Sequence, residues 1–170
     1  MQLTPAFLIF TARPTGIPVQ HFIQPAMTIQ YPEYQPKIKG SAGRELIFDE
    51  IRKQWVKLTP EEWVRQNFLN YLVQVKKYPP SLIAVEKEIL VGEMKKRFDI
   101  LVYQNSKPWM IIECKEQNVA LTEAVIKQLL GYYSVVQTSY MVITNGHYTH
   151  CFGVQANEVV NEPAIPDYIP

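Results

Sequence analysis

The fold is decided by residues 97–115, RFDILVYQNSKPWMIIECK. Two apolar runs, 97–103 and 108–115, flank a polar stretch at 104–107. Short runs rich in Ile, Val, Tyr and Phe on either side of Asn and Ser are typical of two strands joined by a tight turn. The sequence therefore predicts a β-hairpin at the centre of the chain.

Charged residues occupy defined places on this hairpin. Glu113 and Lys115 are two residues apart and therefore share one face of their strand. On the other strand, Asp99 is expected to face away from its apolar neighbours Phe98, Ile100 and Val102. A turn centred near residues 105–106 places Asp99 opposite residue 112 or 113. A connection with an odd number of residues gives the pairing with Glu113, and directly opposed residues face the same side of a sheet. Two carboxylates and one ammonium are then expected on a single patch.

Such a patch needs a chemical reason, because like charges that face each other across two strands repel. A divalent cation removes the conflict, and Mg²⁺ binds one or two carboxylates while it leaves positions for water and phosphate oxygens. We therefore expect Asp99 and Glu113 to hold Mg²⁺, for which Mn²⁺ can substitute. Lys115 would orient or deprotonate an attacking water, or offset negative charge on a reacting phosphate.

The remaining elements extend outward from the hairpin. A helix is predicted from Thr59 to Lys76, because Thr59 suits the N-cap, Pro60 the first turn, and the acids after it the helix dipole. Further predictions are strand pieces within 45–56, strands at 82–90, 140–144 and 148–154, a helix at 121–136, and turns at Gly92 and Asn145-Gly146. The order αβββαβ predicts an α/β fold, restriction-endonuclease-like, with a mixed central sheet flanked by helices.

Both ends of the chain are expected to be loose. Residues 1–40 contain six prolines, a density that disfavours helices and central strands. Residues 1–26 are predicted to be poorly ordered, residues 27–157 to form the domain, and residues 158–170 to form a loose tail. Met27 is an alternative translation start. No positive segment precedes the apolar residues 6–10, so no signal peptide is predicted.

Composition limits the possible classes of protein. Hydrophobic residues make up 47% of the 170 residues and the net charge is +1, so a core can form but charge alone does not indicate a nucleic-acid binder. Two cysteines in a chain of this length indicate reduced thiols in a cytoplasmic protein. The pattern GxxxxGK[ST] is absent from the sequence, so no P-loop motor is predicted.

A family resemblance adds to this interpretation. Asp99 followed by Glu113-Cys-Lys115 resembles the D…(D/E)xK signature of the PD-(D/E)XK nuclease superfamily, with Phe98 in place of the usual proline. The stretch from Thr59 to Gly146 is similar to the N-terminal domain of type I restriction enzyme R subunits. Small bacterial proteins that carry this domain alone are more similar still.

The resemblance implies further site residues. Gln128 and Tyr132 match the QxxxY motif with which the family braces the site or the nucleic acid. The family also takes a metal-supporting acid from the first helix, which here is Glu61 or Glu62. On a helical wheel Glu61 falls within the apolar stripe and Glu62 on its flank, which favours Glu61.

The implied function is Mg²⁺-dependent hydrolysis of DNA by an endonuclease, with a homodimer or partner subunits as the expected assembly. Two alternatives stay open at this point, namely a non-catalytic module that binds nucleic acid or protein, and a nuclease of DNA repair or recombination. The cluster at 95–97, Lys-Lys-Arg, is interpreted as a solubilising charge run, and Glu86 as a strand-face charge paired with Lys87 or Arg97.

Overall fold

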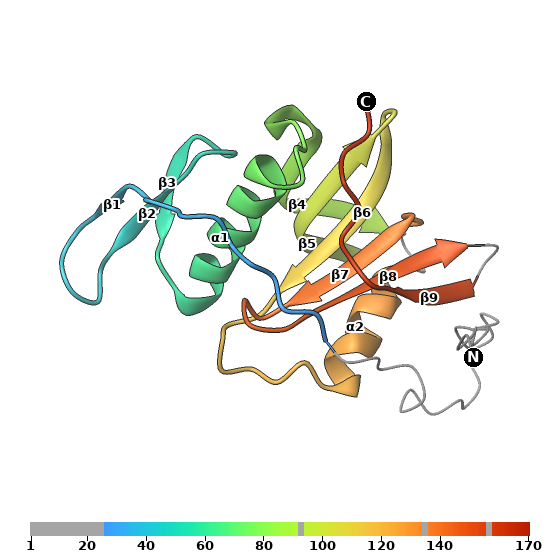
Figure 1. Cartoon of the computed structure of the whole chain (residues 1–170). Helices are drawn as coiled ribbons and strands as arrows, with labels where there is room; N and C mark the ends of the chain where they lie inside the picture. The colour runs from blue at the N-terminus through green and yellow to red at the C-terminus, as the bar shows by residue number, and fades with distance from the viewer. Residues whose placement is uncertain (1–25, 92–93, 134–135, 156–157) are drawn as a thin grey trace, which may run out of the picture.

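The computed structural model describes residues 26–91, 94–133, 136–155 and 158–170, and Figure 1 shows their arrangement. The elements along the chain are β1 (Ile38–Lys39), β2 (Leu46–Asp49), β3 (Gln54–Lys57), α1 (Pro60–Gln74), the 3₁₀ helix η2 (Pro80–Leu82), β4 (Ile83–Val91), β5 (Met94–Gln104), β6 (Lys107–Cys114), α2 (Glu123–Tyr133), β7 (Tyr140–Thr144), β8 (Thr149–Gln155) and β9 (Glu158–Glu162).

Six strands form the main sheet in the order β4-β5-β6-β7-β8-β9, and β1, β2 and β3 form a separate small sheet. Only the pair β6 and β7 is parallel, since α2 carries the chain across between them, and the other paired strands are antiparallel. The predicted αβββαβ order with a mixed sheet is confirmed by α1, β4, β5, β6, α2 and β7.

Helix α1 begins as the sequence predicts. The Thr59 hydroxyl accepts a hydrogen bond from the Glu62 backbone N–H at 3.1 Å, and Pro60 is the first helical residue. Helix α2 begins directly after Thr122, and the backbone N–H of Ile126 donates to the Thr122 carbonyl. A side-chain cap thus marks the start of α1, whereas the first turn of α2 is closed by a backbone hydrogen bond.

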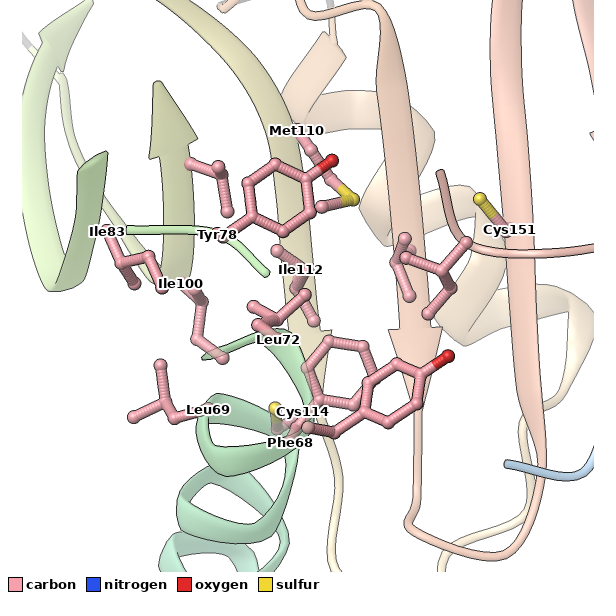
Figure 2. Packing of buried hydrophobic residues seen from close by; sticks show 14 of the residues in the cluster. Phe68, Leu69, Leu72, Tyr78, Ile83, Ile100, Met110, Ile112, Cys114 and Cys151 are labelled. Carbon is pink, nitrogen blue, oxygen red and sulfur yellow. The ribbon is translucent and has the colours of Figure 1, made fainter. Parts of the chain in front are cut away.

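The apolar core lies on both faces of the main sheet. On one face, Val64, Phe68 and Leu72 of α1 pack against Ile100, Ile112 and other strand residues, as Figure 2 shows in part. On the other face, Ile126 and Leu129 of α2 pack against Leu101, Ile111, Met141 and Ile143. The central strands are therefore covered by a helix on each side, which accounts for their nearly continuous apolar sequence.

The connection of the central hairpin differs in length from the odd-numbered one considered in the sequence analysis. Its connection has two residues, Asn105 and Ser106, both with φ near 50–60°, rather than an odd number. This is the conformation of a two-residue hairpin turn in which both residues have positive φ. A register shift between Val102 and Tyr103 adds one residue to β6. Beyond it, the pairing of β5 with β6 ends with Ile100 opposite Ile112. Past that pair, the Asp99 side chain accepts a hydrogen bond from the backbone N–H of Cys114.

The expected alternation of β5 fails at Asp99. Phe98 packs in the core beneath α2, whereas Ile100 packs in the core beneath α1. The pairing of β4 with β5 also omits Glu86 and Asp99, and Glu86 has φ of 49°. The strand therefore rotates at Asp99, and the prediction that Phe98 and Ile100 share a side is wrong.

The prediction of a loose tail at 158–170 is also wrong. Strand β9 pairs along β8, Ile165 is buried, and the backbone N–H of Tyr168 donates to the carbonyl of Lys76. The Tyr78 hydroxyl donates to the Pro166 carbonyl at 3.2 Å. Apolar burial and these hydrogen bonds hold the segment against the end of α1.

At the other terminus, the segment predicted to be poorly ordered lies, except for Ala26, outside the described residues. Met27 pairs with Thr149 through two backbone hydrogen bonds. The strands expected within 45–56 are present as β2 and β3, and the sequence did not indicate β1. None of the helices in the described part of the chain combines the length and hydropathy needed to span a bilayer.

Candidate functional site

Asp99 lies where β5 and β6 separate. Its Oδ2 accepts a hydrogen bond from the backbone N–H of Cys114 at 2.7 Å, and its Oδ1 accepts one from Nη2 of Arg65 at 2.9 Å. The side chain thus bridges the gap between two strands and contacts helix α1. Both oxygens have a fixed direction, because each is held by a donor on a different element.

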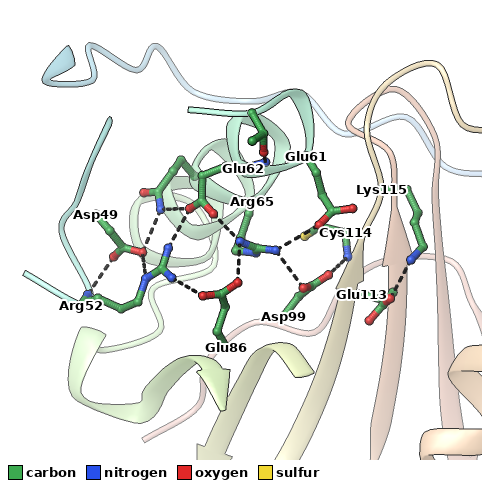
Figure 3. Close-up of polar contacts among 12 residues, drawn as sticks. Asp49, Arg52, Glu61, Glu62, Arg65, Glu86, Asp99, Glu113, Cys114 and Lys115 are labelled. Atoms are coloured by element: carbon green, nitrogen blue, oxygen red, sulfur yellow. Dashed lines mark hydrogen bonds and ion pairs between the residues drawn. The ribbon is translucent and has the colours of Figure 1, made fainter. Parts of the chain in front are cut away.

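Glu113 and Lys115 form an ion pair beside Asp99. Nζ of Lys115 lies 2.7 Å from Oε1 of Glu113, and both side chains are mostly buried. The backbone N–H of Lys115 donates to the Thr144 carbonyl, so β6 continues along β7 up to the pair. Figure 3 shows the carboxylates of Asp99 and Glu113 at the same end of the sheet. The structure therefore brings the three hairpin residues together.

Burial, and after it the charge of Asp99, raises the pKa values of two neighbouring acids, Glu113 and Glu61. The pKa of Glu113 lies above its ordinary value, first because the group is buried and second because Asp99 is close, while Lys115 acts in the opposite direction. The pKa of Glu61 is raised as well, by burial and then by Asp99. The environment of Glu113 and Glu61 therefore disfavours their charged forms unless a cation lies close to them.

Lys115 keeps its charge in this environment. Burial acts to lower its pKa, but the hydrogen bond from its ammonium to Glu113 and the charges of Glu113 and Asp99 outweigh burial, so the pKa is raised. At neutral pH the side chain is an ammonium that lies between carboxylates. It suits stabilisation of negative charge better than removal of a proton.

The two acids of the first helical turn point to different surroundings. Glu61 is half-exposed, lies within electrostatic reach of Asp99 and Lys115, and contacts Arg65 at 3.3 Å. Glu62 is buried and accepts hydrogen bonds from Arg52, Arg65 and Gln66. The helical wheel places Glu61 within the apolar stripe, but in the structure Glu62 is the more buried of the two acids. Glu61 is nevertheless the acid on the side of the candidate site.

Gln128 and Tyr132 lie on helix α2, which follows β6 and precedes β7 along the chain. Their side chains are outside what the structure describes, so their predicted bracing role stays a prediction.

Four residues of the site region were not recognised in the sequence. They are Asp49, Arg52, Arg65 and Gln66, and with Glu62 and Glu86 they form a buried ionic network (Figure 3). Glu86 contacts Nη1 of Arg52 at 2.7 Å and Nη1 of Arg65 at 3.5 Å, so the prediction that it pairs with Lys87 or Arg97 is wrong. The spacing of Arg65 from Glu61 and Glu62 by four and three residues was the available signal.

The donor set fits a hard divalent cation. Within the ranges that the structure describes, no three His, Cys, Asp or Glu side chains are arranged to enclose a metal ion. Mg²⁺ does not require such an enclosure, because one or two carboxylates with substrate oxygens and water are sufficient. Asp99 and Glu113 supply oxygen ligands only, and the pKa of Glu113 is raised first by burial and then by the charge of Asp99.

The chain was compared with known proteins. A family model described as type I restriction enzyme R protein N terminus matches residues 60–166, which is more than half of the chain. No curated protein matches the chain. The matched segment begins with α1 and includes Asp99, Glu113, Lys115 and Gln128, but it excludes the three strands of the small sheet.

Proposed function

The chain belongs to the type I restriction enzyme R protein N-terminal family, and on that premise we propose that it is a Mg²⁺-dependent endonuclease that hydrolyses phosphodiester bonds of DNA. Membership of this family suggests a nuclease-like role and an interaction with DNA. The proposal goes further in naming the reaction, the cofactor and the residues. Partner subunits or a second copy of the chain would complete the assembly.

One observation carries the proposal. Asp99, Glu113 and Lys115 converge at the end of the sheet, with Lys115 bonded to Glu113 and with Asp99 close enough to raise the pKa of Glu113. Carboxylates that lie this close together repel one another, and a bound divalent cation would offset that repulsion. A nuclease of this kind uses them to hold Mg²⁺ against a phosphate.

Each residue has a defined part in the proposed reaction. Asp99 and Glu113 would hold the cation, and Mg²⁺, when bound, would act as a Lewis acid on a phosphodiester oxygen. Lys115, which stays protonated, would orient the attacking water and offset charge that develops on the phosphate. Glu61 would act through water from α1, and Gln128 with Tyr132 would brace the site from α2.

The decisive experiment is a nicking assay on supercoiled plasmid with Mg²⁺ or Mn²⁺. The wild-type protein is expected to convert plasmid to open circles, and Lys115→Ala and Asp99→Asn are expected to lose at least about a hundredfold in rate. Lys107→Ala, which removes an exposed lysine from the first position of β6, is the matched control and should cut normally. Nicking that persists in a folded Lys115→Ala variant would contradict the assignment.

A second function, a non-catalytic DNA-binding module, is favoured by a different observation. Asp99 already pairs with Arg65, and Glu113 already pairs with Lys115, so each proposed metal ligand has a cation supplied by the chain. Calorimetric titration with Mn²⁺ separates the two functions. The endonuclease should give a heat of binding that Asp99→Asn removes, whereas the module should give none at millimolar ion. Restriction and DNA repair would use the same phosphodiester hydrolysis. The neighbouring genes would distinguish these two roles.

A further inference from the structure

The small sheet of β1, β2 and β3 lies beside α1 and outside the segment matched by the family model (Figure 1). One of its faces is turned inward. Ile47 and Asp49 are fully buried on that face, and Asp49 accepts a hydrogen bond from Gln66 of α1 at 2.9 Å. Because side chains alternate along strands, the neighbouring residues point the other way.

We call this other side the outer face. Register places Leu46 between Lys39 and Lys57, and Phe48 opposite Trp55. The backbone N–H of Phe48 donates to the Lys37 carbonyl, so Lys37 lies beside Phe48 in the next row. The outer face therefore consists of six residues, Lys37, Lys39, Leu46, Phe48, Trp55 and Lys57.

The aromatic rings of the outer face form a platform with ammonium groups beside it. The rings of Phe48 and Trp55 lie edge to face with centroids 5.3 Å apart. Nζ of Lys39 lies 4.1 Å from the centroid of the Trp55 ring, and Nζ of Lys37 lies 5.1 Å from that of Phe48. Trp55 is 37% exposed, which is high for such a large apolar side chain. A ring held in place but open to solvent is suited to contact with another flat group.

Charge on the small sheet is positive. Residues 37–57 hold six basic and three acidic side chains, a net charge of +3, whereas the whole chain has +1 and the remainder therefore −2. Asp49 points inward, and Glu50, in the turn after β2, pairs with Lys37 and Lys53. The six residues of the outer face include three lysines and no acidic residue.

We propose that the outer face binds single-stranded DNA, with a base stacked on Trp55 and the flanking phosphates bound by Lys37, Lys39 and Lys57. The choice of DNA as the nucleic acid rests on the proposed function. Stacking of a base on an aromatic ring contributes more than an exposed cation–π contact, so a base displaces the Lys39 ammonium from the Trp55 ring. The displaced ammonium then binds a phosphate. An unpaired base is required, because a paired base keeps its faces within the duplex.

The buried network fixes this surface relative to the candidate active site. Arg52 follows β2 and bonds to Asp49 and Glu62, while Arg65 bonds to Glu62 and Asp99. The path from the small sheet to Asp99 thus consists of short contacts among mostly buried groups. A strand bound on the outer face would be held at a constant position relative to Asp99, beside the site that acts on the duplex or on its displaced strand.

The test is fluorescence anisotropy with a labelled oligothymidine, measured in EDTA so that hydrolysis does not contribute. Trp55→Ala is expected to weaken binding at least about fivefold, and Trp55→Phe, which keeps a ring, should retain most of the affinity. The triple change Lys37→Gln, Lys39→Gln and Lys57→Gln should reduce the slope of log affinity against log salt by about 2, since each phosphate contact on a single strand contributes about 0.7.

The matched control replaces three exposed lysines elsewhere, Lys77, Lys107 and Lys127, by Gln, and its salt slope should stay close to that of the wild type. Circular dichroism confirms that each variant is folded. An unchanged affinity and slope in the folded outer-face triple variant would overturn the proposal. Tighter binding to duplex that Trp55→Ala does not alter, or equal binding to polyglutamate, would overturn it too. Loss of nicking in Lys115→Ala with intact oligothymidine binding separates this inference from the proposed function.

Discussion

Arg65 holds Asp99, with Nη2 of the guanidinium 2.9 Å from Oδ1 of the carboxylate. The two residues are 34 positions apart, on α1 and β5, and the same guanidinium also contacts Glu61, Glu62 and Glu86. Its pKa is raised because the neighbouring carboxylates, Asp99 first, outweigh the burial that acts to lower it. Arg65 is therefore the shared counter-ion of these four carboxylates.

Replacement of Arg65 by Ala should destabilise the fold by about 3 kcal/mol, because buried carboxylates lose their counter-ion. Urea unfolding of the metal-free protein measures this change. Arg97→Ala, which removes an exposed arginine from β5, is the control and should cost less than about 0.5 kcal/mol. Equal effects of the two changes would show that the ion pairs of Arg65 contribute no stability.

Replacement of Glu61 and replacement of Glu62, the two acids in the first turn of α1, should have different effects on activity and stability. Glu61→Gln is expected to lower nicking activity with little change in stability, because Glu61 is half-exposed and lies beside Asp99 and Lys115. Glu62→Gln is expected to cost about 3 kcal/mol of stability, because it breaks buried pairs with Arg52 and Arg65. Nicking rates and thermal unfolding of both variants check this, and the reverse pattern would assign the supporting role to Glu62.

Glu113 should make the metal-free protein less stable as pH rises. Its pKa in the fold is above the 4.5 of a free Glu, so the folded state binds the proton more tightly than the unfolded state. The proton-linked stability is complete below the unfolded pKa and is lost as pH rises through the folded pKa. Glu113→Gln should therefore flatten the rise of Tm on acidification from about pH 7 to about pH 5 in EDTA.

The control for this comparison is Glu88→Gln, which changes an exposed acid on β4. It should leave the pH dependence of Tm close to that of the wild type. A Glu113→Gln variant whose profile also matches the wild type would mean that Glu113 titrates normally in the fold.

Two isoleucines near the C-terminus test the attachment of the last residues. Ile165 is 2% exposed and packs in the core beneath α1, whereas Ile169 is 72% exposed. Ile165→Ala is expected to cost about 2–4 kcal/mol, the usual range for a buried isoleucine, and Ile169→Ala less than about 0.5 kcal/mol. Denaturant midpoints of the two variants give the comparison. Similarly small losses of stability in the two variants would mean that the last residues form a loose tail.

The sequence by itself determined the start of α1, the central hairpin and the three hairpin residues of the candidate site. Thr59 and Pro60 mark the start of α1, and the apolar runs around Asn105 and Ser106 mark the hairpin, because capping, turn conformation and side-chain periodicity depend on neighbours a few positions away. The same local alternation was enough to place Glu113 and Lys115 on one face.

Only the tertiary structure decided how these residues meet. The extra residue in β6 and the rotation of β5 at Asp99 arise from pairing with neighbouring strands. Arg65 faces Asp99 because α1 packs across the sheet, a contact that no local pattern encodes. Burial adds the last part, since the charge of a carboxylate becomes costly, and a partner becomes necessary, only after packing has removed water.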